Sequence, residues 1–234
     1  CGSHSGSKLH SREAFKILWE YDIDINNLKC PKTRTSPLEH NCSGKHAAFL
    51  ATCKKMNWPL DSYLKGDHPL QIEIFRIVSE LLQIPSSEIN AERDDCGAPT
   101  LYLKLLEMSR LYSLLSSSEN AELEQISRAM AINPIMISDN NKFDTEIIKA
   151  SHGNVIGKGG AEGIQCLCKV NEGIGLALKV EDGSKRAKHA VSLHLLKQLE
   201  WISDLRIQDI EEKVFNFPEG VRLEVKGKVK FQES

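Results

Sequence analysis

The chain has 234 residues, of which 41% are hydrophobic and 26% charged, and its formal net charge is −2. Such a composition supports a globular fold with a core and argues against a phosphate-tracking surface for nucleic acid. No apolar run reaches the roughly 18–20 residues that span a bilayer, and no basic-then-apolar leader is present, so we expect a soluble, cytoplasmic protein without a membrane partner. The seven cysteines are an odd number, which favours free or metal-bound thiols over a disulfide framework.

Apolar side chains recur at helical spacing in several segments, and each of these segments is expected to form a helix. The expected helices are one that follows Ser11 as N-cap and includes Ala14, Phe15, Leu18, Trp19 and Tyr21, one from Gly44 or Lys45 to about Trp58, one that begins at Pro69, and others at about 101–115, 120–132 and 185–201.

Short runs rich in β-branched residues and bounded by glycine predict strands in the second half of the chain. They are residues 154–157, 164–170 and 173–180, followed by a hairpin within 221–231. Helices followed by a meander of strands indicate an α/β fold in which a largely antiparallel sheet packs with helices.

The densest cluster of reactive side chains is Asn41-Cys42-Ser43-Gly44-Lys45-His46, where a loop enters a helix. Cys42 and Lys45 are three residues apart, so both can point to one side of the first turn. The positive end of the helix dipole favours a thiolate and disfavours a charged lysine, so a soft metal ion would find two ligands there. The spacing fits equally well a loop with a buried cysteine and solvent-facing bases.

Two further segments combine reactive side chains with turn residues. In Asp94-Asp95-Cys96-Gly97-Ala98-Pro99-Thr100 the acids and the thiol precede Gly and Pro, and Cys96 is a candidate zinc ligand together with Cys42. The segment 157–163 places Lys158 among glycines, where a lysine can serve as a base or an anion clamp. Plain turns are the alternative reading of both segments.

Taken in order, six segments resemble the L-asparaginase II family, in its rhizobial, zinc-containing type. They are residues 1–6, 40–46, 94–100, 143–145, 158–163 and 178–183. The similarity covers nearly the whole chain and weakens after about residue 200, and the Asn-Cys-Ser-Gly-Lys-His segment at 41–46 is its most specific part.

The resemblance implies hydrolysis of L-asparagine to aspartate and ammonia by a single domain, residues 1–234, with a fold like that of serine β-lactamases and glutaminases. It implies a zinc ion held by Cys42, Lys45 and Cys96, with water as the fourth ligand. Asp94 would bind the α-ammonium group of the substrate, and His46 would lie beside metal and substrate. Ser3 and Lys158 would form a Ser–Lys pair in an acyl-enzyme mechanism, and the chain would form a homodimer.

The sequence departs from the family pattern in three places. The family's first Ser-x-x-Lys motif belongs upstream of Ser3, so we expect an N-terminally truncated member that is inactive alone if the nucleophile lies upstream. The segment between Cys30 and Cys42 is shorter than in the family, and Asp95 stands where the family usually has glycine.

Two alternatives therefore stay open. The chain could be a non-catalytic zinc- or asparagine-binding remnant of the family, or another Ser–Lys amidase on this fold, of the penicillin-recognising or glutaminase-like kind. The Cys42, Lys45 and Cys96 set separates the family from such amidases, which need no metal.

Overall fold

The computed structural model of the chain describes residues 2–33, 35–216, 220–221 and 223–229. It divides into two compact units, one formed by residues 1–104 with 136–139 and the other by residues 105–135 with 140–234. In the part of the chain that is described, no helix is both long and apolar enough to cross a membrane. The six cysteines in that part are all free thiols.

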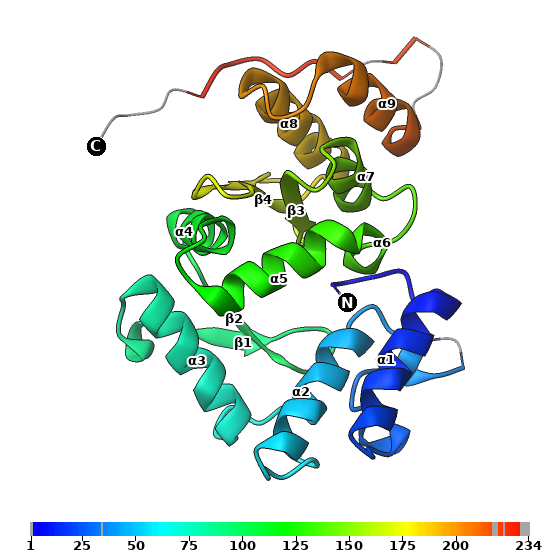
Figure 1. Cartoon of the computed structure of the whole chain (residues 1–234), viewed down its shortest axis with the longest axis vertical. Helices are drawn as coiled ribbons and strands as arrows, with labels where there is room; N and C mark the ends of the chain where they lie inside the picture. Colours follow the sequence, from blue (N-terminus) through cyan, green and yellow to red (C-terminus); the bar gives the residue numbers. More distant parts are fainter. Residues whose placement is uncertain (1, 34, 217–219, 222, 230–234) are drawn as a thin grey trace. The chain divides into compact units, whose positions relative to one another are not determined.

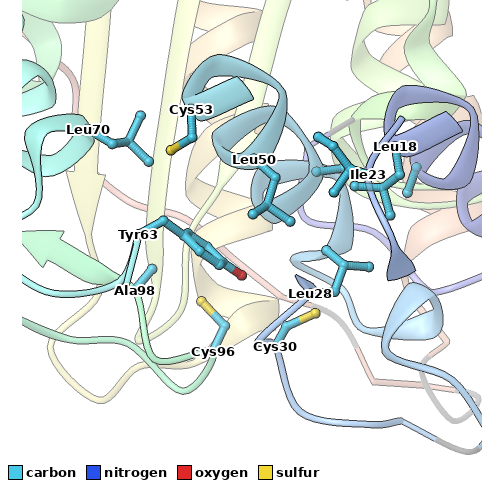
Figure 2. Packing of buried hydrophobic residues seen from close by; sticks show 12 residues of the cluster. Leu18, Ile23, Leu28, Cys30, Leu50, Cys53, Tyr63, Leu70, Cys96 and Ala98 are labelled. Atoms are coloured by element: carbon cyan, nitrogen blue, oxygen red, sulfur yellow. The ribbon is translucent and has the colours of Figure 1, made fainter. Parts of the chain in front are cut away.

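The first unit is built from helices and one small hairpin (Figure 1). Its elements are α1 (Lys8–Glu20), η1 (Ile25–Asn27), η2 (Pro37–Glu39), α2 (Ser43–Lys55), α3 (Pro69–Leu82), η3 (Ser86–Glu88), β1 (Ala91–Arg93) and β2 (Pro99–Leu101). α1 packs against α2, and the strands β1 and β2 pair antiparallel with Arg93 opposite Pro99. The core of this unit surrounds Tyr63, which is fully buried; Figure 2 shows Cys96 and Cys30 near its hydroxyl end.

The second unit is a three-stranded sheet between two layers of helices (Figure 1). Its elements are α4 (Leu105–Ser116), α5 (Ala121–Ile132), α7 (Phe143–Ala150), β3 (Val155–Gly159), β4 (Ile164–Lys169), β5 (Ile174–Lys179), α8 (Lys185–Gln198) and α9 (Asp204–Val214). The strands pair antiparallel in the order β3-β4-β5. α4 and α5 cover one face of the sheet, and α7, α8 and α9 lie on the other. The short helix α6 (Pro134–Ile137) contains residues of both units.

The mixed α/β class and the antiparallel pairing are confirmed, although the strands form two small sheets instead of one. The three strands expected between residues 154 and 180 are present within one or two residues of their expected ends. The helix expected at Pro69 begins there, with His68 as its N-cap. These patterns were readable because periodicity and turn residues agree in each segment.

Other expectations were wrong. Ser11 is not an N-cap, because the helix already begins at Lys8 and Ser11 lies inside it, where its hydroxyl donates to the carbonyl of Leu38. The helix expected from about 101 begins at Leu105, since Leu101 belongs to β2. Residues 221 and 223–229 form no strand, and the rest of the expected hairpin lies outside the described residues. α7 and α9 were not expected, because short apolar stripes give a weak periodic signal.

Gly175 allows α4 to lie directly on β5. A Cβ atom at this position would come within 2.1 Å of the Ser109 carbonyl oxygen and 2.3 Å of the Ser113 nitrogen, both of them backbone atoms of α4. We expect Gly175→Ala to lower the free energy of unfolding by about 1–3 kcal/mol, because the helix has to move away from the sheet. Urea unfolding measures this loss. Gly66→Ala is the control, because a Cβ there meets no atom within 4 Å; equal stability of the two variants would contradict the close contact.

The burial of His189 predicts that the second unit loses stability at acidic pH. Its ring stacks on Phe143 with centroids 4.2 Å apart, and burial, followed by the charge of Lys188, lowers the pKa of His189 to about 4. Since the folded pKa lies below the unfolded value of about 6.5, stability is complete above that pH and falls as the pH drops toward 4. We expect unfolding by urea to become easier between about pH 7 and about pH 4.5, and less so in His189→Phe. An identical slope in both proteins would exclude His189 as a cause.

Candidate functional site

Cys42 lies at the N-cap position of α2, at the positive end of the helix. The preceding 3₁₀ turn η2 is held by a capping box between Ser36 and Glu39, which brings the chain into the helix. The backbone N–H of Cys42 donates to Nδ1 of the buried His40 at 3.0 Å. This bond fixes the direction in which the chain enters α2 and so the position of the thiol.

Cys96 is supplied by the turn that joins β1 to β2. The N–H of Asp94 donates to the Ala98 carbonyl at 2.9 Å, and the N–H of Gly97 donates to the Asp94 carbonyl at 2.7 Å. The left-handed conformation of the turn falls on Gly97, with φ of +83°, where it costs little. Asp95 has no positive φ, so its presence in place of the family's glycine puts no strain on the backbone. The turn buries Cys96 almost completely.

These two elements bring Cys42, Asp94 and Cys96 together. One ligand atom from each lies within 4.8 Å of the other two, and Asp94 Oδ2 lies 3.7 Å from the Cys96 sulfur and 3.3 Å from Lys45 Nζ. Two cysteine sulfurs and a carboxylate oxygen, with an amine close by, are ligand atoms of the kinds that zinc takes in proteins. The structure thus brings Cys42 and Cys96, far apart in sequence, into one possible metal-binding group with Asp94. Within that group the third ligand atom is supplied by Asp94.

The protonation of this group follows from its burial. Burial, more than any neighbour, raises the pKa of Cys42 to about 12. Burial by itself lowers the pKa of Lys45, but the nearby Cys42, Cys96 and Asp94 outweigh it and the net pKa is raised. Burial would raise the pKa of Asp94, but the Asp95 N–H and the Lys45 ammonium reverse this and lower it. Without a metal the Cys42 thiol is therefore protonated and Lys45 is a cation, so a bound metal must displace protons from both.

The N-terminal segment places Ser3 beside the same corner. The N–H of His4 donates to the Asn41 carbonyl at 3.2 Å, and the Asn41 amide donates to Ser3 Oγ at 3.0 Å. The same amide lies 3.5 Å from the Cys42 sulfur. Ser3 is exposed, and among the described residues its side chain bonds only to Asn41. The structure thus links Ser3 to Cys42 through one asparagine.

His46 is fully buried one residue after Lys45, where its Nδ1 lies 2.7 Å from the hydroxyl of Tyr63. Tyr63 accepts the N–H of Lys29 at 2.9 Å, while Nε2 of His46 has no partner among the described residues. Burial, followed by the charge of Lys45, lowers the pKa of His46 to about 4, so the ring is neutral. The contact between Tyr63 and His46 was not predicted from the sequence, because a single tyrosine between turns belongs to no periodic pattern.

Lys158 lies in the second unit, at the end of β3. Its Nζ donates to the Gly159 carbonyl at 2.7 Å and pairs with Asp144 Oδ2 at 3.3 Å. Asp144, in the first turn of α7, also accepts the Gly159 N–H at 3.0 Å and the Gln165 amide at 2.9 Å. Ser3 belongs to the first unit, so the Ser3–Lys158 pair stays a prediction.

The chain is thus a mixed α/β protein with a possible metal-binding group formed by the N-terminus of α2 and the turn between β1 and β2. The family model for L-asparaginase II matches residues 1–231, and the chain belongs to this family of amidohydrolases. A comparison with curated proteins gave no match.

The metal group can be tested by removing its thiols. We expect Cys42→Ala and Cys96→Ala each to abolish stoichiometric zinc binding, because each removes a thiolate ligand. Zinc content after dialysis and competition with a chromophoric chelator measure this. Cys53→Ala is the matched control, since Cys53 lies on the same helix in the apolar core and outside the metal group. Zinc retained by Cys42→Ala would refute the site.

Proposed function

We propose that the chain hydrolyses L-asparagine to L-aspartate and ammonia at the corner formed by Cys42, Asp94 and Cys96. Membership of the L-asparaginase II family carries this proposal, and the convergence of both thiols with Asp94 supports it. A zinc ion held by Cys42, Cys96 and Lys45 would supply positive charge to a reacting oxygen.

Asp94 is the proposed partner of the substrate's α-ammonium group. It is partly exposed and its pKa is lowered, so it is a carboxylate at neutral pH. In the metal-free chain its ion-pair partner is Lys45, 3.3 Å away, and two cations would compete for one carboxylate. If Lys45 gives up its proton and binds the metal, Asp94 becomes free for the substrate. Metal binding by Lys45 would therefore be coupled to binding of the substrate's ammonium group by Asp94.

Ser3 is the proposed nucleophile in this chain. It is exposed beside Cys42 and holds one hydrogen bond, from Asn41, which leaves its O–H free to be donated to a base. Lys158 is the proposed base by resemblance, but a lysine paired with Asp144 is a cation and has no lone pair to offer. The acyl-enzyme mechanism therefore requires that Lys158 loses a proton first.

Other properties rest on the family resemblance alone. They are a fold related to serine β-lactamases and glutaminases, a single domain and a homodimer. We include them in the proposal and draw no step of the chemistry from them.

Two substitutions separate the roles of Lys45 and Asp94. We expect Asp94→Asn to raise the KM for asparagine at least about 10-fold with zinc retained, because a charged hydrogen bond is worth about 1.5–3 kcal/mol. We expect Lys45→Met to lose zinc. Ammonia release and zinc content measure both effects. The control is Asp95→Asn, the same change at the exposed neighbouring residue, which should leave KM and zinc unchanged.

Three results would contradict parts of this proposal. Loss of zinc in Asp94→Asn but not in Lys45→Met would make the carboxylate the ligand. Zinc and asparagine binding without ammonia release would leave a binding protein. Release of ammonia from glutamine but not from asparagine would replace the substrate.

A further inference from the structure

A second buried polar cluster lies in the second unit where α7, β3, β4 and α8 meet. Its side chains gather at the backbone of Gly159. A Cβ atom built on Gly159 would lie 2.7 Å from Lys188 Nζ, 3.0 Å from Gln165 Oε1 and 3.6 Å from Asp144 Oδ2. The Lys158 ammonium reaches the same carboxylate oxygen from the other side of the turn. Two lysines and one carboxylate therefore share this place.

Asp144 is the centre of the cluster and has all its acceptor positions in use. It receives the Gly159 N–H, the Gln165 amide and the Lys158 ammonium, and its side chain is only 7% exposed. Being so enclosed, the carboxylate can balance the charge of one ammonium group and not of two.

Lys188 is the less usual of the two lysines, because it is 3% exposed. Its Nζ donates to the carbonyls of Gly160 and Ile164, both at 3.0 Å. A neutral amine has two N–H groups, and these two carbonyls satisfy both of them. An ammonium group has a third N–H, and among the described residues no acceptor forms a hydrogen bond with it.

The nearest candidate acceptor is itself unsatisfied. Gln165 Oε1 is buried without a hydrogen-bond partner among the described residues, while the amide nitrogen of the same side chain is committed to Asp144. Reversing the amide would direct its oxygen at the carboxylate, so the amide nitrogen stays bonded to Asp144. The geometry thus leaves a third N–H of Lys188 without an acceptor among the described residues.

Among the described residues, Asp144 is the one carboxylate whose charge acts on Lys188. The titratable groups whose charges act on Lys188 are Asp144 on α7, Lys158 on β3, Cys166 on β4 and Lys185 on α8, and Tyr112 on α4 faces Asp144 and Cys166. Burial raises the pKa of both Cys166 and Tyr112, so these two groups stay neutral. One carboxylate therefore faces two amines in a site where Asp144 and Lys188 are buried and Lys158 is partly exposed.

We propose that Lys158 and Lys188 act as a pair that shares the carboxylate of Asp144 and holds one proton fewer than two independent lysines. Lys188 is then a positioning residue, which acts on Lys158 through charge and through the turn 160–164 that it holds. Burial, which lowers the pKa of Lys188, is consistent with this arrangement.

The pair matters for the reaction because it supplies a neutral amine. This step rests on the proposed function, in which Lys158 takes a proton from a serine hydroxyl. At rest the geometry favours the single proton on Lys158, beside Asp144, and when that proton moves to Lys188 the amine of Lys158 has its lone pair free. A second cation nearby lowers the pKa of a lysine, so that its amine is neutral at a lower pH.

The pair can be tested without any activity by NMR of the lysine side chains in the full chain. We expect one amine of the pair to titrate at least about one pH unit below the ordinary value of about 10.4, with its signals assigned through Lys158→Met and Lys188→Met. In Lys188→Met the low step should disappear, because Lys158 then has Asp144 to itself. Lys185→Met is the control, an exposed lysine on the same helix, and should keep the step. A wild-type chain in which both lysines titrate at the ordinary value would overturn the proposal.

The pH profile of asparagine hydrolysis tests the link to the reaction separately. We expect the acid limb of kcat/KM to move to higher pH by about one unit in Lys188→Met and to stay in place in Lys185→Met. A low step that disappears in the NMR titration while the acid limb stays would support the pair and refute Lys158 as the base. A purely structural Lys188 would lower the melting temperature and move neither the step nor the limb.

Discussion

The contact between the first turn of α2 and the turn that joins β1 to β2 is what forms the candidate site of the first unit. It brings Cys42 and Cys96 together within reach of one metal ion, although neither element could hold a metal by itself. Neighbouring residues hold both turns in position. His40 accepts the N–H of Cys42 where the chain enters α2, and Gly97 adopts the left-handed conformation that the hairpin turn requires. Ser3 in the N-terminal segment accepts a hydrogen bond from Asn41. Partial burial keeps the Cys42 thiol protonated until a metal takes the place of its proton.

A second common element is the pairing of an amine with a carboxylate. Lys45 pairs with Asp94 in the first unit, and Lys158 pairs with Asp144 in the second, each at 3.3 Å. The proposed chemistry asks both lysines to work as neutral amines, one as a metal ligand and one as a base. In the first unit a metal ion would drive the proton off, whereas in the second unit a neighbouring lysine would do so. Neither lysine is prepared for its role by burial alone.

The sequence predicted the elements that depend on neighbouring residues, and it missed the features that depend on contacts between segments far apart in the chain. Local patterns predicted α3 and the strands β3, β4 and β5, because periodicity and turn residues agree there. The hairpin β1–β2 escaped notice, since strands of three residues carry almost no alternation. Spacing made Cys42 and Lys45 a candidate site and residue type added Cys96 as a further candidate ligand, but only the family resemblance joined the three into one ligand set. Tyr63 and Lys188 could not be found, because their roles come from burial by segments far away in the chain.

Gly159 illustrates a different use of glycine from Gly97. Its backbone is not left-handed, so an alanine could adopt the same conformation. What alanine could not do is leave room, because its methyl group would occupy the place of the Lys188 ammonium. The residue at 159 and the residue at 188 therefore compete for one volume. Relatives that carry a larger residue at the first position should have lost the lysine at the second, so the two positions are expected to change together during evolution.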